Sequence, residues 1–242
     1  MLVTVPPWLL LKHELARLSV NYSPNLYAVS VAFVGPKGCG KDTTADIFKN
    51  HSVGFNWKIN FADALKEVCA LKFGLTHAEM YDAQLKETKL SRWPWVSPRQ
   101  ILQDEAQASR RLYSDIWVQY WMRHTDKVAG LRESFMCTDI RYPNEYEAFM
   151  SRPNPVLIYV FNQDIEHQRT LGIAEDDPRW CHESESHYDF LRAKANLTVL
   201  NPGDSIQGLE AALKSSIPHF ETATRPDQTY DLQPTTHSAP TR

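Results

Sequence analysis

The stretch VAFVGPKGCGKDTTADIF, residues 31–48, decides the fold. An apolar run leads into a glycine-rich turn and then into a helical pattern, which predicts a strand, a phosphate-binding loop and a helix. Gly35, Gly40 and Lys41 match the motif G-x-x-x-x-G-K-[ST]. Its last position is Asp42, although a serine or threonine hydroxyl normally stands there to hold magnesium.

The loop has the composition that a triphosphate site requires. Successive backbone N–H groups can face the phosphates, and the N-terminus of the following helix adds positive partial charge. Lys41 is expected to reach the β- and γ-phosphate oxygens. The residues predicted to bind the nucleotide are Gly35, Gly38, Cys39, Gly40, Lys41, Asp42 and Thr43.

Asp42 leaves three interpretations open. Magnesium retains several of its waters in proteins, so Asp42 can hold it through a water, or Thr43 can supply the hydroxyl one place later. The third interpretation is structural, because a carboxylate in the first turn of a helix is favourable in itself. The expected metal residues are therefore Asp42 and Thr43, acting through water.

Composition limits the kind of protein. The chain has 242 residues, of which 43% are hydrophobic, enough for one well-packed domain. A formal charge of -3 and a pI near 6.3 give no reason to expect a nucleic-acid partner. The four cysteines form no C-x-x-C pair, which is typical of a reducing compartment, and no apolar run approaches the ~20 residues of a membrane span. We expect a cytoplasmic protein.

Short apolar runs alternate with helical patterns along the middle of the chain. Continuous apolar strands are typical of a parallel sheet covered on both faces. Helices are expected at 98–112, opened by Ser97, at 115–128, and from an Asp204 cap to residue 213. The predicted strands are residues 29–34, 57–61, 134–138, 156–161 and 197–200.

The ends of the chain differ from this middle part. Residues 1–27 precede the first strand and contain a short amphipathic pattern at 7–18. Residues 218–242 are polar and rich in proline and threonine, which predicts a disordered tail.

An aspartate and an arginine follow the third predicted strand. Asp139 and Arg141 are expected beside the phosphate loop, because open α/β sheets bind ligands at the carboxyl ends of their strands. The carboxylate can orient a magnesium water or a substrate hydroxyl, and the guanidinium can clamp a phosphate. A surface salt bridge is the structural alternative. The guanine-binding tetrapeptide N-K-x-D is missing from the sequence, which disfavours a GTPase.

Five segments occur in the same order, and at similar spacing, as in the deoxynucleoside monophosphate kinases of bacteriophages. The chain resembles that family over about residues 28–217, and the G-K-D-T ending of the loop is typical of it. The segments are GPKGCGKDTTAD (35–46), FADALKEV (61–68), SPRQILQ (97–103), TDIRYPNEYEA (138–148) and HESES (182–186).

The resemblance implies a P-loop three-layer α/β/α fold with a parallel sheet of about five strands and a small lid at about residues 165–187. It also implies Lys41, Asp139 and Arg141 as catalytic residues. The residues implied for the acceptor nucleotide are Lys37, Lys66, Arg99, Gln103, Trp117, Asp139, Arg141 and Glu145. Those implied for the lid are Arg169, Arg179, His182 and Glu185.

Several of these residues have structural alternatives. Trp117 lies on an apolar helical stripe, where a core position is as natural as stacking on a base. Lys66 and Lys86 can be solvated, and of the adjacent Arg110 and Arg111 at most one can point into the same pocket. The sequence DEAQASRR (104–111) replaces a Leu-Gly-Thr run found in relatives and leaves the base preference open.

The implied reaction is transfer of the γ-phosphoryl of ATP to a deoxynucleoside monophosphate, with magnesium as cofactor. A homodimer and a host cytoplasm are compatible with the resemblance. Two other functions share the loop: another small-molecule kinase, such as one acting on dephospho-coenzyme A, and a protein that binds nucleotide without catalysis.

Overall fold

The computed structural model describes residues 28–52, 54–130 and 133–216. The amphipathic pattern at 7–18 and the tail predicted at 218–242 lie outside these residues. None of the helices in the described ranges is long and apolar enough to cross a bilayer.

A parallel sheet of five strands in the order β2-β3-β1-β4-β5 forms the centre of the protein. The phosphate loop follows the central strand, and Ser30 in this strand is paired with Phe135 on one side and Pro155 on the other. All five residues of β1 are buried, as a continuous apolar run predicts. The strands are β1 (Ser30–Val34), β2 (Trp57–Lys58), β3 (Phe135–Cys137), β4 (Pro155–Phe161) and β5 (Leu197–Leu200).

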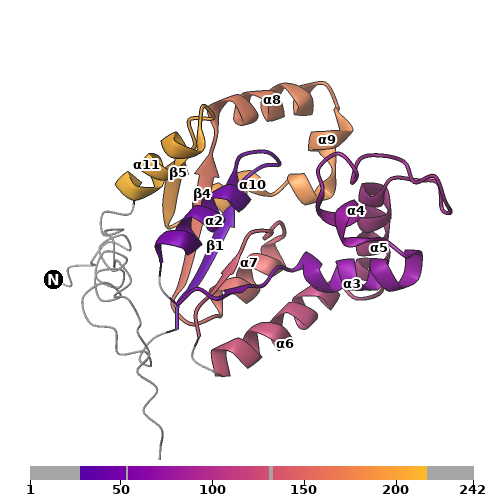
Figure 1. Ribbon diagram of the computed structural model, residues 1–242, viewed down its shortest axis with the longest axis horizontal. Coiled ribbons are helices and arrows are strands. Elements are labelled where there is room, and N and C mark those ends of the chain that lie inside the picture. Colours follow the sequence, from indigo (N-terminus) through magenta and orange to yellow (C-terminus); the bar gives the residue numbers. More distant parts are fainter. Residues whose placement is uncertain (1–27, 53, 131–132, 217–242) are drawn as a thin grey trace, which may run out of the picture.

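Helices cover both faces of the sheet, so the predicted α/β/α fold is confirmed (Figure 1). One face packs on α2 and α11, and the other packs on α6, α7 and α10. The helical elements are α2 (Lys41–His51), α3 (Ala62–Phe73), α4 (His77–Tyr81), α5 (Pro98–Leu112), α6 (Ile116–Gly130), α7 (Pro143–Met150), α8 (Gln163–Ala174), α9 (Pro178–Cys181), the 3-10 turn η1 (Glu183–Glu185), α10 (Tyr188–Lys194) and α11 (Ile206–Ser216).

A separate apolar cluster lies beside the sheet, where α3, α4 and α5 pack together (Figure 1). Its buried side chains include Leu65 and Cys69 of α3, Leu102 of α5 and Trp117 of α6. This small helical unit forms one wall of the cavity described below.

Local signals predicted some boundaries well and others poorly. Ser97 caps α5 as expected, since its hydroxyl accepts the N–H of Gln100 at 3.2 Å. The second strand is much shorter than the predicted residues 57–61. Asp204 was a wrong choice of cap for α11, because the hydroxyl of Ser205 accepts the N–H of Gly208 at 3.0 Å.

Candidate active site

The phosphate loop has a backbone that only glycine adopts easily. Gly35, Gly38 and Gly40 have φ angles of 149°, 86° and 92°. A Cβ atom on Gly35 would lie 2.7 Å from the carbonyl oxygen of Val160 in β4. The glycines therefore allow the loop to turn tightly over the ends of β1 and β4 before α2 begins at Lys41.

Asn201, directly after β5, holds the loop from the other side. Its amide nitrogen donates to the carbonyl oxygen of Cys39 at 2.8 Å, and its amide oxygen accepts the N–H of Gly203 at 3.0 Å. A Cβ atom on Gly40 would lie 2.4 Å from the same amide nitrogen. Burial raises the pKa of the Cys39 thiol, so Cys39 contributes backbone to the loop rather than a reactive thiolate.

Asp42 lies in the first turn of α2 and reaches the ends of two strands. Its Oδ1 accepts the hydroxyl of Thr138 at 2.8 Å and the ammonium of Lys58 at 3.0 Å. Thr138 is itself fixed, because its N–H donates to the side chain of Asn60 at 2.9 Å. Burial by itself would raise the pKa of Asp42, but Lys41, Lys58 and these hydrogen bonds lower it below the usual value.

This arrangement fits magnesium. Asp42 uses Oδ1 for both hydrogen bonds and is 62% exposed, beside Lys41 in a wide groove that also contains Asp139. An ionised carboxylate is a suitable oxygen ligand for magnesium or for one of its waters. Thr43 is exposed, whereas Thr44 turns inward and donates its hydroxyl to the carbonyl of Gly40 at 2.8 Å.

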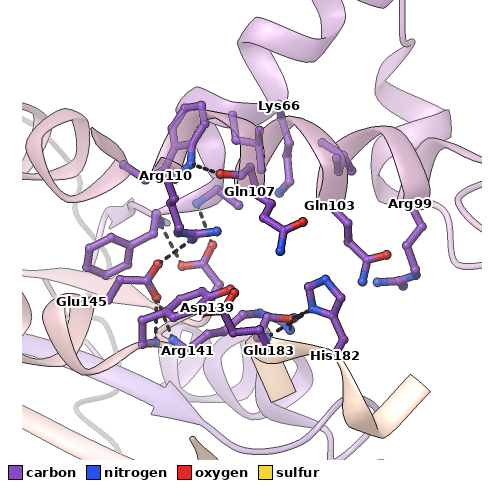
Figure 2. A pocket seen from close by; sticks show the side chains of 18 of the residues that line it. Lys66, Arg99, Gln103, Gln107, Arg110, Asp139, Arg141, Glu145, His182 and Glu183 are labelled. Carbon is purple, nitrogen blue, oxygen red and sulfur yellow. Dashed lines mark hydrogen bonds and ion pairs between the residues drawn. The ribbon is translucent and has the colours of Figure 1, made fainter. Parts of the chain in front are cut away.

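A cavity of about 130 Å³ lies between α5 and the chain that follows β3. It shares Lys66, Lys86, Asp139 and Arg141 with the wide groove that contains Lys41 and Asp42 of the loop helix. One wall is formed by a single face of α5, where Arg99, Gln103, Gln107 and Arg110 recur at intervals of three to four residues (Figure 2). The carboxamides of Gln103 and Gln107 can each donate and accept hydrogen bonds. The wall therefore offers a cation at each end and two amides between them.

Positive charge gathers in this cavity from four separate segments. Lys66 of α3, Lys86 before α5, Arg99 of α5 and Arg141 after β3 all line it. Burial, followed by the effects of Arg99, Lys66 and Arg141, lowers the pKa of Lys86 to about 8. Lys86 makes no ion pair within the described ranges, so the cluster contains a cation that lacks a neutralising partner.

The predicted catalytic residues after β3, Asp139 and Arg141, both interact with neighbouring groups of the protein. Both carboxylate oxygens of Asp139 accept backbone N–H groups at the start of α3, from Phe61 at 2.8 Å and from Ala62 at 2.9 Å. Arg141 lines the cavity, and its guanidinium pairs with the buried carboxylate of Glu185 in η1. Asp139 thus joins the third strand to the wall of the cavity, and Glu185 orients Arg141.

Glu145 of α7 also lines the cavity and is almost fully buried. Its carboxylate accepts the N–H of Arg141 at 2.8 Å and a guanidinium N–H of Arg110 at 3.1 Å. Burial, followed by the nearby Asp139, raises the pKa of Glu145 to about 7, against the lowering effect of Arg110. Of the two adjacent arginines, Arg110 faces the cavity, and Arg111 is exposed.

The phosphate loop and the cavity are joined by one carboxylate. Lys37 of the loop donates to Oε1 of Glu87 at 2.8 Å, and Nε of Arg99 donates to the same oxygen at 2.5 Å. Glu87 follows Lys86 directly, in the segment between α4 and α5. Two predicted phosphate-binding residues thus share a single acidic partner.

Trp117 occupies the core position that the sequence allows, and its contact with a base stays a prediction. It is buried in the cluster of α3, α4 and α5, its indole N–H lies 3.4 Å from the carbonyl of Ala106, and it also lines the cavity. Lys66 faces the cavity as well, with its ammonium 4.0 Å from the centre of the Tyr81 ring.

The predicted lid residues do not lie together. His182 lines the cavity (Figure 2), with Nδ1 2.9 Å from the hydroxyl of Ser184, whereas Glu185 is buried and pairs with Arg141. Arg169 lies outside the cavity, where it pairs with Asp189 and Glu166 at 2.6 and 3.2 Å. The side chain of Arg179 is outside the described part of the structure.

Sequence patterns missed several residues of the site. Gln107 could have been found, since it follows Gln103 at helical spacing, and Arg110 was considered only as one of two adjacent arginines. Lys58, Thr138, Glu87 and Asn201 carry no local signal, because each meets its partner through the tertiary fold.

No known family model and no curated protein sequence matches this chain. Among solved structures, shikimate kinase from Acinetobacter baumannii in complex with shikimate is similar, with a TM-score of 0.41, 12% identity and coverage of 78% of this chain and 90% of that one. TT1252 from Thermus thermophilus gives a TM-score of 0.44 and 16% identity over 81% of this chain and all of that one. Because both likenesses are remote, the function is inferred below from the site itself.

Proposed function

We propose that the protein is a deoxynucleoside monophosphate kinase, which transfers the γ-phosphoryl of ATP to a deoxynucleoside monophosphate. The observation that carries this proposal is the cluster of Lys66, Lys86, Arg99 and Arg141 in a cavity beside the phosphate loop. A cavity with converging cations suits an anionic acceptor, and the loop suits the donor. The resemblance of the five sequence segments agrees with this assignment.

The residues have distinct roles in this proposal. The N–H groups of the loop and Lys41 hold the triphosphate of ATP, and Arg141 and Arg99 hold the acceptor phosphate. Magnesium, when bound beside Asp42, would neutralise part of the charge on the phosphates. Transfer needs no covalent intermediate with the protein, because alignment and charge stabilisation dominate phosphoryl transfer.

The base and sugar are assigned to the far part of the cavity. Gln103 and Gln107 offer hydrogen bonds to a base edge, and Trp117 walls that region. The segment at about residues 165–187, which contains α8, α9 and η1, is proposed as the lid that excludes water during transfer. Arg169, which lies outside the cavity, would then need lid movement to reach the phosphates.

The test is release of ADP with ATP, magnesium and each of dAMP, dCMP, dGMP, dTMP and dUMP in separate reactions. Turnover that depends on one or more of these acceptors supports the proposal and identifies the base preference. If ATP binds but none of the five supports turnover, the acceptor is wrong, and dephospho-coenzyme A becomes the next acceptor to assay. Binding of ATP without any transfer would indicate a nucleotide-binding protein without catalysis.

A further inference from the structure

We propose that Glu87 is a competing anion that occupies Lys37 and Arg99 in the empty protein and links binding at the donor and acceptor sites. This inference rests on the proposed function, since it treats Arg99 as a ligand of the acceptor phosphate. It also takes Lys37, which the resemblance assigns to the acceptor, as a ligand of ATP because Lys37 lies within the phosphate loop. It adds a residue that competes with phosphate for two cations and that no sequence motif indicates.

The geometry resembles a phosphate oxygen held between two cations. Lys37 and Arg99 come from different parts of the chain, yet both donate to Oε1 of Glu87, at 2.8 and 2.5 Å. Lys37 belongs to the phosphate loop, and Arg99 stands at the start of the α5 wall of the cavity. A single carboxylate oxygen therefore occupies the position between the two sites where a bound phosphate would find both cations.

The contact is placed so that a ligand can displace it. The side chains of Lys37, Glu87 and Arg99 are 42%, 45% and 27% exposed, respectively. Ion pairs this exposed contribute little net stability, because water screens them. A phosphate carries up to twice the charge of a carboxylate and has three acceptor oxygens, so it competes effectively for the same two cations.

The positive charge around Glu87 favours its displacement by a phosphate. Lys86, the residue before Glu87, lies among Lys66, Arg99 and Arg141 in the cavity. When Glu87 releases Arg99, the cavity gains a further free cation. The negative phosphates of ATP bound at Lys37 would repel Glu87 and weaken its hold on Arg99, which would improve binding of the acceptor phosphate. By thermodynamic linkage, the acceptor would improve ATP binding by the same factor.

The experiment compares the wild-type protein with Glu87→Gln, which keeps the shape of the side chain and removes its charge. Calorimetry measures the affinity for inorganic phosphate, with no turnover required. Loss of the competing carboxylate is expected to tighten phosphate binding about three- to tenfold, the range that two exposed ion pairs allow. Unchanged or weaker binding would overturn the proposal, since a carboxylate that only orients the cations would weaken binding when neutralised.

The matched control is Glu210→Gln. Glu210 also has two nitrogen partners on one oxygen, the ammonium of Lys214 at 2.6 Å and Nε2 of His51 at 2.8 Å, but it belongs to α11 and does not line the cavity. Its phosphate affinity should equal that of the wild type.

A second measurement tests the linking role. The affinity for a deoxynucleoside monophosphate is compared with and without a non-hydrolysable ATP analogue, and the gain should shrink in Glu87→Gln. An undiminished gain overturns the link. Neither binding measurement depends on product formation, so a failed kinase assay and a failed role for Glu87 are distinguishable.

Discussion

The hydroxyl of Thr138, at the end of β3, donates a 2.8 Å hydrogen bond to the carboxylate of Asp42, at the start of α2. In the motif G-x-x-x-x-G-K-[ST] the loop helix supplies the hydroxyl. Here the loop helix supplies the carboxylate and the neighbouring strand supplies the hydroxyl. Asp42, the unusual residue of the motif, is therefore hydrogen-bonded to Thr138 and Lys58.

This relationship predicts which hydroxyl matters for magnesium. Replacing Thr138 by valine removes one hydrogen bond to Asp42 at nearly constant volume, at a cost of about 1 kcal/mol, or roughly a fivefold change in affinity. The magnesium concentration that gives half-maximal ATP binding should therefore rise several-fold in Thr138→Val. Titration of magnesium against a fluorescent ATP analogue measures this concentration.

Thr43→Val tests the competing assignment, in which Thr43 supplies the hydroxyl for the metal. Thr43 is exposed, and no hydrogen bond of its side chain occurs within the described residues. The magnesium requirement of Thr43→Val should match that of the wild type. A larger effect of Thr43→Val than of Thr138→Val would assign the metal to Thr43 instead.

Lys41→Ala tests the donor site. Lys41 begins α2 directly after the left-handed Gly40, with its side chain beside Asp42 in the groove. Loss of a charge that stabilises the transition state should lower kcat by about 100-fold or more. The melting temperature should stay close to the wild-type value.

Lys49→Ala provides the comparison for Lys41→Ala, since Lys49 is exposed in the last turn of the same helix. It should leave kcat unchanged. Near-normal turnover in Lys41→Ala would refute the role assigned to Lys41.

Asn201→Ala tests whether the loop is held from β5. The variant loses the bonds to the carbonyl of Cys39 and from the N–H of Gly203, each worth about 1 kcal/mol. A looser loop should weaken ATP binding about five- to tenfold and lower the melting temperature by a few degrees. Equilibrium binding and thermal unfolding measure the two effects.

The exposed Asn50 of α2 offers a matched substitution, Asn50→Ala, that removes the same amide from the surface. It should change neither quantity. Wild-type ATP affinity in Asn201→Ala would show that the loop keeps its shape without Asn201.

The sequence predicted the parts of this protein that local chemistry determines. Buried parallel strands have continuous apolar runs, the loop needs its glycines, and Ser97 followed by Pro98 is a local signal for the start of a helix. It could not predict contacts between segments far apart in the chain. Lys58 and Thr138 meet Asp42 only because β2 and β3 lie side by side, and Glu87 meets Lys37 only because the segment between α4 and α5 folds against the phosphate loop.

The environment of Lys86 also could not be predicted from the sequence. The sequence allows a solvated lysine there, whereas the fold brings three other cations close to it. Burial and these neighbours lower its pKa to about 8, so the ammonium is charged at neutral pH and neutral well above pH 8. In the empty protein the free energy of unfolding should rise between pH 8 and 10.5, because the unfolded chain binds the proton more tightly.

Acceptor affinity should have the opposite dependence in that alkaline range. A monophosphate gains its second negative charge above about pH 6, and Lys86 loses its positive charge above pH 8. Affinity for the monophosphate should therefore rise towards pH 6, stay high until about pH 8 and then fall.

Binding isotherms across this range for the wild type, Lys86→Met and the exposed neighbour Lys89→Met isolate the contribution of Lys86. Lys86→Met should bind more weakly at pH 7 and lose the alkaline decline, whereas Lys89→Met should follow the wild type. An alkaline decline that persists in Lys86→Met would assign the titration to another group and remove Lys86 from the acceptor site.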